Sequence, residues 1–294
     1  MPSPATFGIG AIVQLTGLSD HVIRAWERRY AAIEPTRNPA GTRRYSEADV
    51  ERLKLLRDGI AAGHRIGALA GLVNEEIRAL LARIHRQDST AEIEEMLEAI
   101  RRLDVPELER LLTREALALG PFDFCHSLVG ELLDRVGAGW AQGKLCVAEE
   151  HMATAAIKSI LMSLLRFGTD RVSGEMMVFS TLPHERHELG ALMAAVCAQN
   201  AGARVVYLGP DLPVSEIVTA VRRSGAKVVG VSAALAPEKK NGAALPELRN
   251  RLPGTVELWI GGRGWADFDH PTGVRLIGDL DRLQHRVGRR SINV

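Results

Sequence analysis

The sequence has few aromatic residues, few cysteines and no long apolar run, and each shortage excludes a class of protein. Aromatic residues make up 4% of the 294 residues, and the three cysteines lie far apart without a C-x-x-C pair. This spacing argues against a zinc site and against a disulfide framework. No apolar run reaches the roughly 20 residues that a membrane-spanning helix needs. Residues 1–11 lack the basic and apolar segments of a signal peptide, so we expect a protein of the reducing cytoplasm that does not enter a membrane.

An excess of charge of one sign is also missing. Lysine and arginine together number 37 against 36 aspartate and glutamate residues, and the formal net charge is +1. Any binding to nucleic acid must therefore come from a local basic patch rather than from the field of the whole protein. What is present, 46% hydrophobic and 25% charged residues, is typical of a globular protein of two or three domains.

Three patterns follow one another along the chain. Residues up to about Asn74 indicate short helices with basic turns, and the following residues, to about Asp170, carry apolar side chains at helical spacing. Within this second pattern, Ile84–Glu92 is polar and lacks periodicity, so we expect a linker there. The third pattern, from about Glu175, alternates strands with helices, which predicts a parallel, doubly wound sheet. The expected strands are Met176–Ser180, Arg204–Leu208, Lys227–Ser232, Val256–Ile260 and Val274–Ile277.

The N-terminal pattern has the spacing of a helix-turn-helix. Gly10–Thr16 is a short helical run, Gly17 suits the turn, and Ser19 is placed to cap a second helix that reaches about Arg29. Several side chains of this second helix can meet phosphates and base edges, namely His21, Arg24, Arg28 and Arg29. On these residues alone, a small helical bundle with a solvated arginine face is an open alternative.

A basic stretch with one aromatic residue, Thr36–Tyr45, follows this helix. It holds three arginines and no acid, and its proline and glycine bend it like a wing. Ser46 and Asp49 then form the pattern of a capping box, which predicts the start of a third helix. Together with Ile23–Tyr30 and Asp49–Leu53, the wing resembles the winged-helix DNA-binding domain of the MerR family.

This resemblance implies a dimer that binds a pseudo-palindromic site in double-stranded operator DNA. It also implies that Trp26 packs in the core rather than against DNA. The residues expected at the DNA are His21, Arg24, Arg28, Arg43, Arg44 and Tyr45.

Trp140 is the conspicuous residue of the helical middle segment. Three glycines, Gly137, Gly139 and Gly143, surround it and lower the helix propensity by about 1 kcal/mol each relative to alanine. A chain bears that cost more readily where a ligand must come close. Nine residues after Trp140 comes the pair Glu150–His151. Taken alone, a core tryptophan and a surface Glu-His pair also explain this pattern.

Glu185, His187 and Gly190 form an E-x-H-x-x-G motif after the first expected strand of the third pattern. A neutral imidazole in such a loop can bind a metal, and a carboxylate two residues earlier can hold its other ring nitrogen. A glycine there lets the backbone pass close to a bulky ligand. A lone histidine in a strand–helix loop is more often a surface residue, so the motif needs support from elsewhere in the chain.

Two further signals supply that support. Ser232 ends the third expected strand, within Val231–Leu235, and Gly261–Gly262 follow the fourth strand. Doubly wound sheets bind ligands at these carboxyl ends. A hydroxyl and a glycine pair suit a long polar tail between sheet and helix, whereas the sequence has neither a G-x-x-x-x-G-K-[ST] nor a G-x-G-x-x-G phosphate loop.

The three signals together resemble the cobalamin-binding domain with D-x-H-x-x-G, S-x-L and G-G motifs. The resemblance implies that His187 replaces dimethylbenzimidazole as the lower axial ligand of cobalt, and that the freed nucleotide tail lies near the serine and the glycine pair. Glu185 stands where aspartate is more common, and the leucine of S-x-L falls on Ala234 or Leu235, of which we choose Leu235. A flavodoxin-like domain without ligand is the alternative.

With the helical segment included, nearly the whole chain resembles the CarH/LitR-type light-responsive repressors. The resemblance implies that Trp140 covers the upper axial group of cobalamin. It also implies that Glu150 bonds the ribose of a 5′-deoxyadenosyl group and that His151 lines the same pocket.

One departure from that family concerns the upper face. In its photoreceptor branch a histidine often follows this tryptophan and captures cobalt after light breaks the cobalt–carbon bond. Here the residue is Ala141, which has no donor. Another histidine (His126, His151 or His184) or water then takes the site, or the light response differs or is absent.

We therefore expect a cobalamin-dependent, light-responsive transcriptional repressor and not an enzyme. In such relatives adenosylcobalamin promotes, in the dark, an oligomer that occupies the operator, and light disperses it. A dimer or a tetramer is expected here, with methylcobalamin as the alternative ligand. Three other functions stay open: a cobalamin-binding regulator without a light switch, a regulator that has lost cobalamin, and a corrinoid protein or methyltransferase-type subunit. The helix-turn-helix argues against the last of these.

The expected fold class is multi-domain, with α and α/β parts. It comprises a MerR-type winged helix-turn-helix over residues 1–75 and a linker with a four-helix-bundle cap over residues 76–172. A doubly wound, Rossmann- or flavodoxin-like cobalamin-binding domain is expected over residues 173–294.

Overall fold

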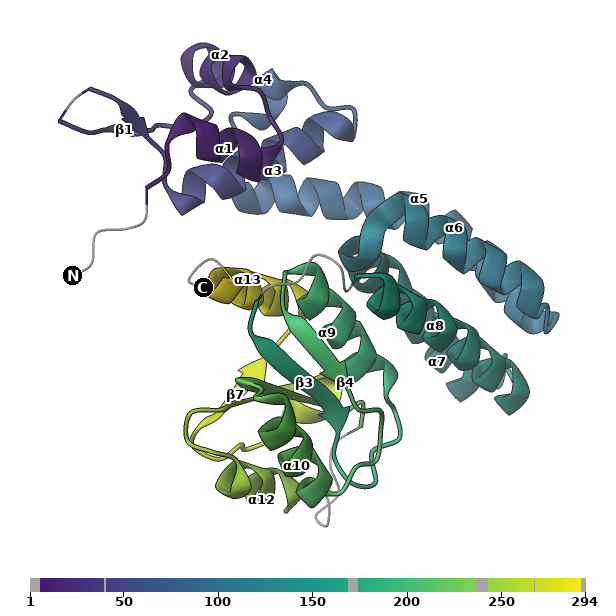
Figure 1. Cartoon of the computed structure of the whole chain (residues 1–294). Coiled ribbons are helices and arrows are strands. Elements are labelled where there is room, and N and C mark those ends of the chain that lie inside the picture. The colour runs from purple at the N-terminus through teal and green to yellow at the C-terminus, as the bar shows by residue number, and fades with distance from the viewer. Residues whose placement is uncertain (1–5, 40, 169–173, 236–242, 267, 292–294) are drawn as a thin grey trace. The chain divides into compact units, whose positions relative to one another are not determined.

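The chain forms two compact units, Met1–Thr90 and Ala91–Val294. The computed structural model describes residues 6–39, 41–168, 174–235, 243–266 and 268–291 (Figure 1). No helix within these ranges combines the length and the apolar character needed to cross a membrane.

The first unit contains the expected helix-turn-helix. Helix α1 (Ile9–Thr16) ends at Gly17, which has the left-handed φ of 69° that glycine adopts without strain. Helix α2 (Asp20–Tyr30) begins at Ser19, whose hydroxyl accepts from the Val22 amide at 3.3 Å. Both features confirm the prediction from sequence.

The wing and the third helix of this unit also agree with prediction. Strands β1 (Thr36–Arg37) and β2 (Arg43–Arg44) pair antiparallel. Helix α3 (Glu47–Ala61) starts with a reciprocal capping box between Ser46 and Asp49. The short helix α4 (Ile66–Leu69) follows, and the unit ends within α5 (Asn74–Arg101).

The linker expected at residues 84–92 is not an irregular segment, because α5 runs through it without a break. Its residues include good helix formers such as arginine, glutamine and alanine, and it holds neither proline nor glycine. The missing apolar periodicity is therefore compatible with a helix and did not require a loop. The boundary between the two units falls within this stretch, at Thr90.

The second unit begins with a helical bundle. It comprises the end of α5 with α6 (Val105–Asp123), the π-helix η1 (Phe124–Val129), α7 (Gly130–Ala141) and α8 (Val147–Phe167). Helix α6 kinks where Gly120, with φ 76°, precedes Pro121, because proline removes a backbone donor and clashes with the preceding turn.

A five-stranded parallel sheet follows, with the strand order β4-β3-β5-β6-β7. The strands are β3 (Met176–Thr181), β4 (Arg204–Tyr207), β5 (Val228–Ser232), β6 (Glu257–Gly261) and β7 (Val274–Ile277). Every expected strand is present, with ends displaced by one residue at most. This confirms the doubly wound parallel fold.

Helices cover both faces of the sheet (Figure 1). Helices α9 (Leu189–Asn200) and α13 (Leu280–Ser291) lie on one face, and α10 (Val214–Ser224) and α12 (Ala244–Arg251) on the other. The core of the first face continues into the bundle, since α9 packs against α6 and α8 as well as against the sheet. The bundle and the sheet therefore share one hydrophobic core.

Candidate functional site

The sheet order creates a ligand-binding edge. Strands β3 and β5 are neighbours, and the chain leaves β3 for β4 on one side and returns to β5 on the other, so their carboxyl ends form the topological switch point. The pairing register places Thr181 beside Ser232, and Ser232 beside Gly261. The His187 loop, Ser232 and the glycine pair thus start from the same edge.

The carboxylate of Glu185 fixes the His187 ring. One Glu185 oxygen lies 2.6 Å from His187 Nδ1 and accepts the His187 backbone amide at 2.8 Å. The other oxygen accepts the backbone amide of Ala234 at 3.1 Å. The carboxylate is 12% exposed and the imidazole 60% exposed. With Nδ1 held by the carboxylate, Nε2 is the nitrogen available to a metal.

The Ala234 contact clarifies the Ser-Ala-Ala-Leu stretch. Ala234 contributes a backbone donor that ties the β5 loop to the histidine loop, whereas the Leu235 side chain is exposed. The leucine role in the motif therefore has no buried counterpart at Leu235. Sequence reasoning missed this contact, because a backbone donor leaves no signal in residue type.

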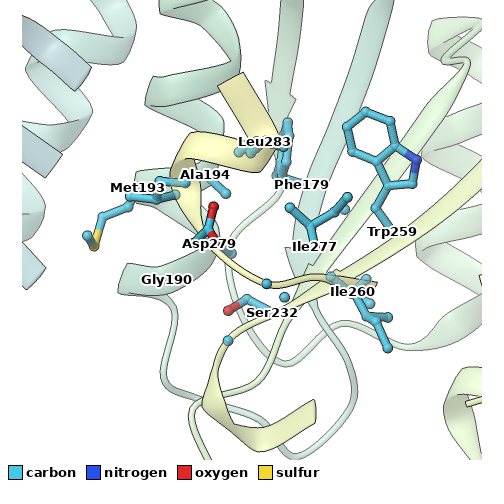
Figure 2. Close-up of a pocket in the computed structure, with 17 residues that line it drawn as sticks. Phe179, Gly190, Met193, Ala194, Ser232, Trp259, Ile260, Ile277, Asp279 and Leu283 are labelled. Carbon is cyan, nitrogen blue, oxygen red and sulfur yellow. The ribbon is translucent and has the colours of Figure 1, made fainter. Parts of the chain in front are cut away.

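A cavity of about 220 Å³ opens between the sheet and helices α9 and α13. Figure 2 shows the apolar side chains that line it, with Ser232 and Asp279 as the carriers of side-chain oxygen. Its lining includes Gly190, Ser232, Gly261 and Gly262, all expected from sequence. It also includes residues that sequence reasoning did not select, among them Phe179, Met193, Trp259, Asp279 and Leu283. The only sequence signal of the apolar residues in this set was that of ordinary strand and helix core positions, and Asp279 lies in the turn between β7 and α13.

Two glycines let the backbone pack closely at this edge. A Cβ atom on Gly262, whose φ is 96°, would lie 2.3 Å from the Ala233 carbonyl oxygen. One on Gly190 would lie 2.7 Å from Ser232 Oγ. The backbone therefore approaches Ser232 closely from both sides, as the wall of a ligand site requires.

The expected cap residues lie on two adjacent helices. Trp140, on α7, is 55% exposed, which is unusual for so large an apolar side chain. On α8, Glu150 accepts from the Thr154 hydroxyl at 3.1 Å, and His151 Nδ1 lies 3.8 Å from Glu150. Within the described ranges, no hydrogen bond or ion pair connects Trp140, Glu150 or His151 to His187.

Two glycines near Trp140 have local structural reasons. A Cβ on Gly139 would lie 2.9 Å from Leu145 Cδ1, and Gly143 takes a left-handed φ of 68° in the turn after α7. A Cβ added to Gly137 would meet no atom within 4 Å, so close packing does not explain this glycine. The glycine cluster is thus a weaker sign of a ligand than its sequence indicated.

Other histidines differ in their availability. His126 Nε2 pairs with Asp281 of α13 at 2.9 Å, and its ring stacks on Phe122. The hydrogen bond that His126 donates to Asp281 raises the pKa of His126. His184 lies in the His187 loop with a strained φ of 68° and donates its amide to Asp211 at 2.7 Å. His126 is therefore engaged elsewhere, while His151 and His184 have exposed rings.

The expected DNA-facing side chains occupy α2 and the wing. His21 and Arg28 are exposed on α2, and Arg24 is exposed and pairs with Asp20 at 3.0 Å. Arg43 on β2 is held by both oxygens of Glu27 at 2.9 Å, and this hydrogen bond raises its pKa. Arg44 beside it is half-buried. The wing is thus fastened to α2 through a charged pair.

Tyr45 corrects one expectation. Its side chain is 0% exposed, and its buried hydroxyl has no hydrogen-bond partner among the residues that the structure describes. Its backbone forms an isolated bridge with Phe7, which turns the ring inward among Ile23, Trp26 and other core residues. A side chain in this position packs in the core, so we leave Tyr45 out of the proposed DNA contacts.

Comparison with known families agrees with both halves of the chain. Residues 7–76 match the MerR HTH family regulatory protein model, and residues 92–165 match a B12 binding domain model. The second range includes Trp140, Glu150 and His151.

Individual relatives cover most of the chain. It is 32% identical over 269 residues to the HTH-type transcriptional repressor CarH of Myxococcus xanthus, a match that spans 87% of this chain and 89% of CarH. It is 26% identical to CarA of the same organism, over 88% of this chain and 87% of CarA. The monomethylamine corrinoid protein of Methanosarcina barkeri shares the fold with a TM-score of 0.53 at 15% identity, over 68% of this chain and 98% of that one. The chain therefore belongs to the CarH family of cobalamin-binding MerR-type regulators, which are transcription factors and not enzymes.

Proposed function

We propose that the chain is a light-responsive transcriptional repressor that binds operator DNA as a dimer or tetramer in the dark, with adenosylcobalamin bound, and leaves it in light. The observation that carries the proposal is the His187 ring. Glu185 holds its Nδ1, and the loop lies at the ligand-binding edge that also bounds the apolar cavity.

The lower side of the site fits a corrinoid with a displaced tail. His187 would bind cobalt through Nε2, with Glu185 fixing the ring and raising its basicity. The apolar cavity would take the flat dimethylbenzimidazole, with Gly190, Ser232 and the glycine pair along its wall.

The upper side is assigned to the bundle. Trp140 would cover the upper axial group, Glu150 would accept from the ribose and His151 would line the same pocket. The exposure of Trp140 supports this role, since a ligand would bury a surface that the protein alone leaves open. When bound, the cofactor supplies a light-sensitive cobalt–carbon bond. Ala141 offers no donor for the exposed cobalt face, so we propose that the response proceeds without a protein ligand from that position.

Linkage connects the two halves of the function. A ligand that binds the DNA-competent assembly more tightly stabilises that assembly, and loss of the upper group removes the preference. The proposed DNA contacts are His21, Arg24, Arg28, Arg43 and Arg44, and the buried Tyr45 is not among them. Both bonds to Glu27 use Arg43 Nε, so they fix the wing, and the terminal guanidinium nitrogens are the donors that we propose for a DNA phosphate.

The central experiment reconstitutes the full-length protein with adenosylcobalamin in the dark. The wild type should show the visible spectrum of a histidine-ligated corrinoid. His187→Ala should lose that spectrum, because alanine offers no donor at this position. Glu150→Gln serves as a control that should keep the spectrum, since it alters only the upper side. A wild-type spectrum in His187→Ala would refute the lower-ligand assignment.

The same samples test the light switch. Operator DNA should be shifted in the dark and released after green light, with a parallel change in the size-exclusion profile. Arg43→Ala should weaken the dark shift and leave corrinoid uptake unchanged. Equal occupancy in dark and light would favour the second candidate, a cobalamin-binding regulator without a light switch. Ala141 is the observation that favours that candidate.

A further inference from the structure

A buried carboxylate next to His187 joins the sheet to the bundle. Glu188, the residue before α9, accepts from Lys158 Nζ of α8 at 2.5 Å and from the Tyr207 hydroxyl at 2.6 Å. Its side chain is 14% exposed. Burial, followed by the bond to Glu188, raises the pKa of the Tyr207 phenol, which therefore stays protonated and donates. Both Glu188 oxygens thus have a strong, partly desolvated partner.

Lys158 lies on α8, the helix that carries two of the proposed upper-side residues, Glu150 and His151. His151 and Lys158 are two turns apart on α8, so they lie on the same helical face, about 10 Å apart along the axis. Glu188 follows His187 directly in the chain. A short, continuous connection therefore runs from His151 along α8, through Lys158 and Glu188, to the proposed cobalt ligand.

A second bridge between the bundle and the sheet offers a contrast. Arg263, directly after the glycine pair, is paired with Asp134 of α7, the helix of Trp140. These side chains are 78% and 47% exposed, so water and salt screen their attraction. In the Lys158–Glu188 pair the carboxylate is less exposed than that of Asp134, and it also accepts a hydrogen bond from Tyr207. It is therefore the stronger of the two connections.

We propose that Glu188 is a positioning residue that couples cap helix α8 to the His187 loop and so selects corrinoids with a large upper group. A fixed spacing between α8 and His187 favours a ligand that contacts both sides, because the protein need not order either side on binding. A ligand with a small upper group uses mainly His187 and gains little from the connection. This inference rests on the proposed function.

The test compares two corrinoids on the full-length protein in the dark. We expect Lys158→Met to weaken adenosylcobalamin binding about tenfold and methylcobalamin binding less than about threefold. Tyr207→Phe, which removes one bond to Glu188 without touching the bundle, should give a smaller loss with the same selectivity. Asp134→Asn is the matched control, because it removes the exposed bridge, and it should change either affinity by less than about twofold.

A charge exchange separates coupling from a merely structural role. Lys158→Glu combined with Glu188→Lys should recover most of the preference for adenosylcobalamin that each single variant loses. Equal losses for both corrinoids, or an exchanged pair no better than the single variants, would overturn the proposal. Thermal unfolding of each variant without ligand shows whether it is folded. If the charge variants are misfolded, the comparison of the two corrinoids on Tyr207→Phe decides the question. If the wild type binds neither corrinoid, the proposed function fails instead.

Discussion

At the residue scale, backbone conformation decides several positions that residue type alone leaves ambiguous. Gly262 combines a left-handed φ with a carbonyl oxygen where its Cβ would be, so no other residue fits without movement. Glu185 acts twice, since it orients His187 and also holds the β5 loop through Ala234. Single residues therefore determine both the shape and the donor geometry of the proposed site.

The first prediction concerns Gly262. Gly262→Ala should destabilise the second unit by about 1–3 kcal/mol, because it adds left-handed strain and a clash with Ala233. Corrinoid binding should fall with it. Gly254→Ala, at an exposed turn with open space around its Cβ, should change stability by less than about 0.5 kcal/mol. Urea unfolding followed by circular dichroism measures both, and equal effects would contradict the assignment of strain to Gly262.

The second prediction concerns Tyr45. Tyr45→Phe should be neutral or stabilise the first unit by about 1 kcal/mol, because it removes a buried hydroxyl for which the described part of the chain offers no partner. Its affinity for operator DNA should equal that of the wild type. Arg28→Ala, at an exposed position on α2, should reduce that affinity. A gel-shift titration compares the three proteins, and a loss of DNA binding in Tyr45→Phe would restore Tyr45 as a contact.

At the scale of elements, side-chain pairs join helices and strands that are separated in the chain. Glu27 fastens the wing to α2, Lys158 joins α8 to the start of α9, and His126 joins η1 to α13. The kink at Gly120–Pro121 leads directly into η1 and so into the position of His126. Irregular segments of the bundle thus supply one of its connections to the sheet.

The third prediction concerns pH. Asp281 raises the pKa of His126 in the folded protein. The pair therefore contributes its full stabilisation of the fold below the pKa of His126 in the unfolded chain, about 6.5, and this contribution is lost as pH rises through the higher pKa of the folded state. Because the ring is 42% exposed, we expect only about 0.5 kcal/mol. The stability gap between wild type and His126→Gln should be larger at about pH 5.5 than at about pH 9. Salt at about 1 M should reduce this stability difference. A stability difference that grows as pH rises would contradict the raised pKa of His126.

At the scale of the whole molecule, the division into two units separates recognition of DNA from binding of the cofactor. The first unit holds the helix-turn-helix and wing, and the second holds the bundle and the sheet around one shared core. A ligand that binds only the second unit acts on DNA binding through assembly or through the connecting helix α5.

The fourth prediction follows from this division. Calorimetry in the dark should resolve a separate unfolding transition for each unit. Adenosylcobalamin should raise the midpoint temperature of the second unit's transition and leave that of the first unit unchanged. At a free concentration about 100 times its Kd, the stabilisation should be about 2.7 kcal/mol. Tyr45→Phe, which alters only the first unit, identifies the other transition. A single transition that moves as a whole would show that the two units unfold together.

Much of this architecture could be predicted from the sequence. Helix caps, the wing and all five strands depend on short-range patterns, in which Ser19, Gly17 and the apolar runs act locally. The order of His187, Ser232 and Gly261 was also readable, because parallel strands bring their carboxyl ends to one edge. The linker at residues 84–92 was the exception, since a helix without an apolar stripe resembles a loop in sequence.

The sequence by itself thus determined most of the secondary structure, the family and the residues proposed to hold cobalt. Only the tertiary structure decided which atoms meet. It buried Tyr45, gave Ala234 a backbone role in place of Leu235, and joined Lys158 and Tyr207 to Glu188. These contacts join residues far apart in the chain, and their partners are set by helix packing and strand register rather than by local spacing.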